Sequence, residues 1–181
     1  MKIVKLLIFA LLLTGQISCK DDQKLSDAYV EPAVSTYYFI RHAEKIRSDS
    51  EDIDPELSQK GLGRAMHWAE ILNDVDLDAI YSTDYERTTM TAAPTSVKKD
   101  ITVQYYDPST IDIEQFKIDN LGKKVLVVGH SNSTPDFVNK MLGEEEYEAM
   151  DDYDNGSLFI VQVTGKNVTS NRLHFNCSCP D

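Results

Sequence analysis

Cysteine is scarce in this 181-residue chain, which contains only three. Cys177 and Cys179 are two positions apart, a spacing at which a bridge would be strained. One such pair is not a disulfide framework, and it supplies only two of the about four ligands that a zinc ion needs. The scarcity therefore excludes a disulfide-stapled domain and a cysteine-based zinc site.

Positive charge is also in short supply. The chain has 18 Lys and Arg against 30 Asp and Glu, which gives a formal net charge of −12. General binding to nucleic acid needs a basic face that displaces counterions, so we expect no nucleic-acid partner. Polyanionic substrates are disfavoured too, unless arginines are concentrated locally.

Long hydrophobic runs are missing apart from one at the N-terminus. Lys2 and Lys5 form a short basic start, Leu6 to Leu13 are apolar, and residues 14–18 are smaller or more polar. The apolar run is too short for a stable membrane-spanning helix. This layout predicts a signal peptide over residues 1–18 and therefore an exported protein.

Cys19 follows this segment directly. The stretch Gly15-Gln16-Ile17-Ser18-Cys19 resembles the lipobox of bacterial lipoproteins, although Gln16 stands where leucine or another aliphatic residue is usual. The resemblance implies acylation of Cys19 and a protein lipid-anchored at a membrane surface of the cell envelope, in the periplasm or at the outer membrane. Ordinary cleavage without lipid is the alternative. Residues 19–34 are polar, lack periodicity and are predicted to be a tether.

The remainder shows no repeat or second linker, so we predict one domain over residues 35–176 and a tail over 177–181. Strands and helices alternate along it. The fold class is α/β, a three-layer sandwich with a mostly parallel central sheet, helices on both faces and a C-terminal antiparallel hairpin. Predicted strands cover residues 35–40, 78–82, 101–105, 124–129, 157–163 and a last segment ending near 175.

Helix boundaries follow from the usual start and stop signals. A helix is expected to begin at Ser58, and another to run from Asp84 to Ala93, where Pro94 should break it. A short helix is expected at 111–118. Thr134-Pro135 predicts the start of a helix that Gly143 closes.

Three polar clusters each follow a predicted strand. They cover residues 41–45 (Arg-His-Ala-Glu-Lys), 81–88 (Tyr-Ser-Thr-Asp-Tyr-Glu-Arg-Thr) and 129–133 (Gly-His-Ser-Asn-Ser). The carboxyl ends of neighbouring parallel strands form one rim, where ligands bind in open α/β sheets. We therefore expect Arg41, His42, Arg87 and His130 to meet in one pocket.

These side chains suit phosphoryl transfer. Guanidinium groups hold phosphate oxygens in bidentate fashion and offset the charge that spreads during transfer. A neutral imidazole can attack phosphorus and carry it as an intermediate, and a second imidazole can donate to a phosphate oxygen. Backbone amides at the start of the helix near Thr134 could assist.

The same residues resemble the histidine phosphatase superfamily, which has the phosphoglycerate-mutase-like fold. Residues 41–44 are similar to its Arg-His-Gly-Glu signature, and 81–84 with Arg87-Thr88 and Thr91-Ala92 to its Tyr-Ser-Ser-Asp…Arg…Thr-Ala segment. Leu57…Gly61…Arg64-Ala65 and Gly129-His130 match two further motifs. The four motifs occur in family order across residues 36–163.

The resemblance implies that His42 is the nucleophile and that Arg41, Arg87 and His130 form the phosphate pocket, with no metal and no cofactor. Ala43 replaces the usual glycine. One branch takes its general acid from a Leu-x-Glu motif, which this chain lacks, and others from an aspartate after the second histidine, where Ser131 stands. Asp107 occupies roughly the first place and is the candidate acid, although Asp107-Pro108-Ser109 is also good turn chemistry. The reserve candidates are Asp136 and Glu44.

The implied activity is hydrolysis of a small phosphorylated substrate, a phosphomonoester, through a phosphohistidine. The alternatives are a phosphoglycerate-mutase-type phosphoryl transferase, a phosphatase of phosphohistidine or phosphoprotein, and a non-catalytic phospho-ligand binding lipoprotein. The short segment between Tyr106 and Lys124 favours a hydrolase with an open site.

Other charged residues have plainer interpretations. Lys45, Arg47 and the acidic run from Asp49 to Asp54 are expected in solvated loops beside the pocket mouth. Residues 151–156 resemble a calcium loop only superficially, because a tyrosine occupies one ligand position and a glutamine replaces the closing acid.

Overall fold

The computed structural model describes residues 32–49 and 51–179. The predicted signal peptide (1–18), the predicted lipidation site Cys19 and residues 20–31 of the predicted tether lie outside the described residues. Within the described ranges, no helix is both long enough and apolar enough to cross a bilayer.

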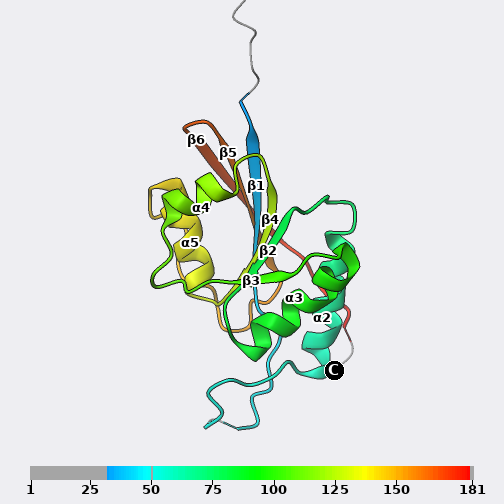
Figure 1. The fold of residues 1–181 in the computed structure, drawn as a ribbon. Coiled ribbons are helices and arrows are strands. Elements are labelled where there is room, and N and C mark those ends of the chain that lie inside the picture. The colour runs from blue at the N-terminus through cyan, green and yellow to red at the C-terminus, as the bar shows by residue number, and fades with distance from the viewer. Residues whose placement is uncertain (1–31, 50, 180–181) are drawn as a thin grey trace, which may run out of the picture. The chain divides into compact units, whose positions relative to one another are not determined.

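Strands and helices alternate through the first five strands, as the sequence predicts (Figure 1). The elements in chain order are β1 (Val34–Arg41), α2 (Gln59–Ile71), β2 (Ala79–Ser82), α3 (Glu86–Lys99), β3 (Val103–Tyr105), α4 (Ile113–Asp119), β4 (Lys124–Gly129), α5 (Ser133–Leu142), β5 (Ser157–Thr164) and β6 (Asn167–His174).

The strands form one six-stranded sheet in the order β3-β2-β4-β1-β5-β6. Strands β1 to β4 are parallel to one another, whereas β5 is antiparallel to β1 and to β6. The predicted α/β class with a C-terminal antiparallel hairpin is confirmed. Because β1, β2 and β4 are neighbours and parallel, their carboxyl ends lie at one edge of the sheet.

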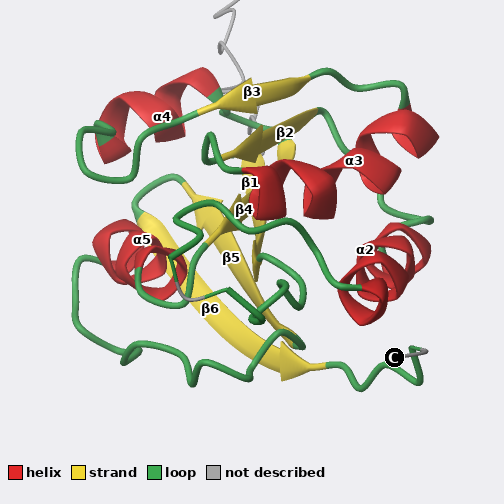
Figure 2. Ribbon diagram, turned by 90° about the horizontal axis from the view of Figure 1, so that it is seen from below, coloured by secondary structure: helices red, strands yellow, loops and turns green. Residues whose placement is uncertain are grey.

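Helices cover both faces of the sheet (Figure 2). Tyr37 and Phe39 of β1 face a core that includes Phe116 of α4 and Phe137 of α5. Ile40, on the opposite face of the same strand, belongs to a second core with Trp68 of α2. Alternate side chains of β1 thus pack into two separate cores. This packing fixes the register of the strand and so the position of the polar residues that follow it.

The start of α2 confirms the sequence signal. Ser58 is its N-cap, and the Ser58 hydroxyl accepts a hydrogen bond from the backbone N–H of Gly61. Gly61 is required there, because a Cβ atom on it would lie 2.0 Å from the carbonyl oxygen of Glu44. The helix therefore packs directly against the backbone that follows the Arg41-His42 pair.

The predicted end of the next helix is wrong. Helix α3 passes through Pro94 and ends at Lys99, with Asp100 in the left-handed region at φ 55°. Proline removes one backbone donor, but the turn beyond it still buries Thr95. Burial of that face outweighs the loss of one hydrogen bond, so the proline does not terminate the helix.

The start of α5 differs from the prediction by one or two residues. The N-cap is Asn132 rather than Thr134, and Ser133 accepts a hydrogen bond at its hydroxyl from the backbone N–H of His130. Gly143 ends the helix with a positive φ of 80°, as expected.

The C-terminal segment contains one disulfide, between Cys177 and Cys179. The two Cα atoms are 5.1 Å apart, a separation that a disulfide can span.

Candidate active site

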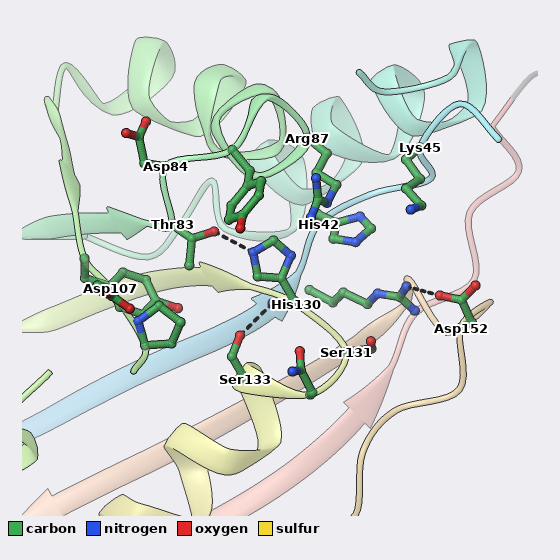
Figure 3. Close-up of a pocket in the computed structure, with 15 residues that line it drawn as sticks. His42, Lys45, Thr83, Asp84, Arg87, Asp107, His130, Ser131, Ser133 and Asp152 are labelled. Atoms are coloured by element: carbon green, nitrogen blue, oxygen red, sulfur yellow. Dashed lines mark hydrogen bonds and ion pairs between the residues drawn. The ribbon is translucent and has the colours of Figure 1, made fainter. Parts of the chain in front are cut away.

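A pocket lies at the carboxyl edge of β1, β2 and β4. It has a volume of about 670 Å³, and Figure 3 shows its walls. Arg41 ends β1, His42 follows it, and His130 follows β4 directly. Arg87 lies in the first turn of α3. All four predicted phosphate-site residues line this one pocket.

His42 is buried, with 3% of its surface exposed, and its ring orientation is fixed. Its Nδ1 lies 2.7 Å from the carbonyl oxygen of Ala43, which can only accept, so Nδ1 carries the proton. The backbone is held as well: the His42 N–H donates to the carbonyl of Gly129, and its carbonyl accepts from the Asn155 side chain. Nε2 therefore keeps its lone pair, the state that a nucleophile needs.

Burial lowers the pKa of His42 to about 3, and the nearby charges of Arg41 and Arg87 act in the same direction. The imidazole is consequently neutral at ordinary pH. A group that must attack phosphorus is thus available without first losing a proton.

His130 faces His42 across the pocket (Figure 3). The two ring centroids are 5.6 Å apart with an interplanar angle of 63°. The Nε2 atom of His130 is 2.9 Å from the hydroxyl of Thr83, and that hydroxyl also bonds to Thr88. Burial lowers the pKa of His130 to about 4, again assisted by Arg87 and Arg41.

Arg41 is 2% exposed and holds a full charge inside the protein. Its Nη1 donates to the carbonyl oxygen of Asp151 at 2.7 Å, and its Nη2 donates to Oδ1 of Asp152 at 2.8 Å. Its Nε is buried and has no hydrogen-bond partner among the described residues. The guanidinium is therefore oriented by the segment before β5 and keeps unused donor capacity.

Arg87 is held in a comparable way. Its Nη1 is 3.0 Å from Oδ1 of Asp54, and its Cζ lies 4.4 Å from the ring centroid of Tyr85. Asp54 also accepts from the backbone N–H of Glu86 at the start of α3. Residues 49 and 51–53 are exposed in a loop, as expected, and Asp54 at the end of this run in addition orients a pocket arginine.

The candidate general acids are placed less favourably. Asp107 is on the pocket wall, but its Oδ1 accepts from the backbone N–H and the hydroxyl of Ser109, and these bonds hold its pKa below the usual value. Neither reserve lines the pocket. Glu44 is bound to Arg64 through both carboxylate oxygens, and Asp136 pairs with Lys140 one turn along α5.

Sequence reasoning missed Thr83 as a partner of His130, and Asp54 and Asp152 as partners of the arginines. Sequence reasoning also missed Asn155, whose side chain donates to the carbonyl of His42. Thr83 sits inside a recognised motif, so its position was a usable signal. The other contacts join loops distant in sequence and leave no local pattern.

Among residues 32–49 and 51–179, no group of three or more His, Cys, Asp or Glu side chains is arranged to hold a metal ion. The donors around the pocket are imidazole and guanidinium groups, which suit a phosphate oxyanion.

Comparisons with known structures agree with this fold. SixA, a protein histidine phosphatase solved with tungstate, superposes with a TM-score of 0.62 at 14% identity and covers 77% of this chain and 96% of its own. A phosphoglycerate mutase from Bacillus anthracis gives 0.59 at 16% identity, covering 79% and 94%. A mycobacterial glucosyl-3-phosphoglycerate phosphatase gives 0.60 at 14%, covering 80% and 100%. No curated protein sequence matches the chain.

The fold is thus the phosphoglycerate-mutase-like α/β fold. Residues 37–108 match the model of the histidine phosphatase superfamily (branch 1). This segment contains the Arg41-His42 and Arg87 motifs. The match covers less than half of the chain, and over this segment the chain is similar to the histidine phosphatase superfamily.

Proposed function

We propose that this protein is a metal-independent phosphomonoester hydrolase that works through a phosphohistidine on His42. The observation that carries the proposal is the state of His42: a buried, neutral imidazole whose Nδ1 proton is committed to Ala43. Its other nitrogen shares a pocket with two arginines and a second histidine.

The reaction has two displacements at phosphorus. In the first, Nε2 of His42 forms the N–P bond while the ester P–O bond breaks and the alcohol leaves with a proton from the solvent or an acid. In the second, water attacks the phosphohistidine, the N–P bond breaks and inorganic phosphate departs. Arg41 and Arg87 offset the charge on the equatorial oxygens in both steps, and His130 lies where it can donate to one of them.

A hydrolase is favoured over a mutase by the open wall beside β3. The chain passes from β3, which ends at Tyr105, to α4, which begins at Ile113, without a longer insertion over the pocket. A mutase must retain a bisphosphate intermediate long enough to return the phosphoryl group, which such an insertion would assist.

The test is turnover of p-nitrophenyl phosphate by the purified domain. His42→Ala should lower kcat by on the order of 10³-fold or more, as removal of a covalent nucleophile does. His67→Ala is a matched control, since His67 lies in α2 outside the pocket. Tight phosphate binding without turnover of any ester would instead indicate a phospho-ligand binding protein.

A second candidate is hydrolysis of a labile phosphoramidate such as phosphohistidine. It is favoured because the carboxylates that line the pocket are poorly suited to act as a general acid. The pKa of Asp107 is below its usual value, the ion pairs of Asp152 hold its pKa at about 2, and Figure 3 shows Asp84 directed away from the histidines. A labile leaving group needs less help from an acid. Faster turnover of phosphoramidate than of alkyl phosphates would support this candidate, and the reverse order would refute it.

We further propose that the protein is exported and held at the cell envelope by acylation of Cys19. The support is the sequence pattern of residues 1–19. Cys19→Ser in the full chain should move the protein from the membrane fraction to the soluble fraction. Unchanged membrane association would contradict lipidation at this residue.

A further inference from the structure

The segment between α5 and β5 is fastened to the catalytic edge of the sheet by several contacts. The backbone N–H of Met150 donates to the carbonyl of Ser131, and Asn155 donates to the carbonyl of His42. Asp151 accepts from Arg41 through its carbonyl oxygen. These contacts hold the segment beside the pocket, and among its residues Asp152 lines the pocket.

Asp152 connects this segment to two arginines. Its Oδ1 accepts from Nη2 of Arg41 at 2.8 Å, and its Oδ2 pairs with Nη1 of Arg47. Arg47 also donates from Nη2 to the backbone carbonyl of Asp152, and its Cζ lies 4.9 Å from the ring centroid of Tyr153. One carboxylate thus joins a buried pocket arginine to a half-exposed arginine in the loop after β1.

We propose that Asp152 is a positioning residue, which acts through Arg41 to orient its guanidinium and to weaken the hold of the pocket on free phosphate. The proposal rests on the proposed function and names a further determinant of the same site.

The physical argument has two parts. Asp152 supplies the only side-chain anion paired with Arg41 among the described residues. It therefore fixes the rotation of a guanidinium that otherwise donates to the backbone carbonyls of Asp151 and Asp154. The same carboxylate lines the pocket, so it repels any anion bound at Arg41. Its pKa of about 2 means that this charge is present at every pH at which the enzyme would be assayed.

The two effects predict that removal of the Asp152 charge changes kcat and phosphate affinity in opposite directions. Asp152→Asn keeps the shape of the side chain but removes its charge. Loss of orientation should lower kcat by about tenfold. Loss of repulsion should tighten inorganic phosphate, measured by calorimetry, also by roughly tenfold. If Asp152 had only a structural role, Asp152→Asn would lower kcat, phosphate affinity and the melting temperature together.

Arg47→Ala is the matched control. This substitution removes the arginine of the Arg47–Asp152 ion pair but leaves the Asp152–Arg41 pair intact. Removal of this cation should lower phosphate affinity by only about two- to threefold, because the Arg47 guanidinium is partly exposed and screened by solvent. The two variants should therefore change phosphate affinity in opposite directions.

Three outcomes would overturn the proposal. The first two are a phosphate affinity that is unchanged or lower in Asp152→Asn, and an unchanged kcat in that variant. The third is a change of phosphate affinity in the same direction in Asp152→Asn and Arg47→Ala, which would mean that the connection between the two loops is what matters. Asp152→Ser, measured in parallel, must change phosphate affinity in the same direction as Asp152→Asn. Because phosphate affinity needs no turnover, this test stands even if the wild-type protein hydrolyses nothing, in which case the proposed function fails and the role of Asp152 is still decided.

Discussion

The two pocket histidines should make the fold sensitive to mild acid. The ordinary pKa of histidine is about 6.5, and burial lowers it to about 3 for His42 and about 4 for His130 in the folded protein. As the pH falls, the unfolded chain therefore binds protons before the folded chain does. The stability that depends on neutral histidines is complete above about pH 6.5 and is lost progressively as the pH falls toward about 4 and 3.

The size of the effect between about pH 7 and about pH 5 depends little on the exact folded-state values. At about pH 5 the unfolded histidines are protonated and the folded ones are not, and about 1.5 pH units separate this pH from the unfolded pKa. Each histidine then costs about 2 kcal/mol, so the pair costs about 4 kcal/mol. Asp152, whose pKa is also lowered, begins to contribute only at lower pH.

The assay is urea denaturation of the described domain at about pH 7 and about pH 5 in a phosphate-free buffer, because phosphate would stabilise the folded state. The double variant His42→Gln, His130→Gln should lose most of the pH dependence that the wild type shows in this window. Equal pH dependence in wild type and double variant would refute the reasoning, and so would a wild type whose stability is flat between the two values.

Three further substitutions test the packing around the site. Arg64→Ala should lower the free energy of unfolding by about 3 kcal/mol, because it leaves the Glu44 carboxylate without its bidentate partner; a loss below about 1 kcal/mol would show that solvent replaces the pair. Gly129→Ala should cost about 1–3 kcal/mol in the same assay, since the new Cβ would lie within 2.9 Å of two side-chain oxygens; an unchanged melting temperature would contradict that crowding. Thr83→Val should lower kcat/KM by about fivefold to tenfold, because the hydrogen bond that orients His130 is lost; unchanged kinetics would remove Thr83 from the site.

Much of this architecture could be predicted from local sequence. The strand at 124–129 and the helix end at Gly143 carry strong local signals, and the structure has both where they are expected. The proximity of the four pocket residues could be predicted because the carboxyl ends of neighbouring parallel strands lie at one edge of the sheet.

Other features could not be predicted because they depend on tertiary contacts. Helix α3 continues past Pro94 since its buried face outweighs one missing hydrogen bond, and no local rule measures that balance. Asp54 and Asp152 read as members of acidic loops, because an ion pair across 33 or 111 positions leaves no periodic trace. The carboxylates that orient the two arginines were therefore visible only in the folded chain.

Identification of the phosphorylated residue is the most direct test of the mechanism. The purified domain is mixed with a phosphate ester, quenched within milliseconds in alkali, where phosphohistidine survives, and mapped by mass spectrometry. We predict a phosphoryl group on Nε2 of His42 that disappears at the rate of turnover and is absent from His42→Ala. Turnover with the label on another residue, or turnover that persists in His42→Ala, would contradict the account.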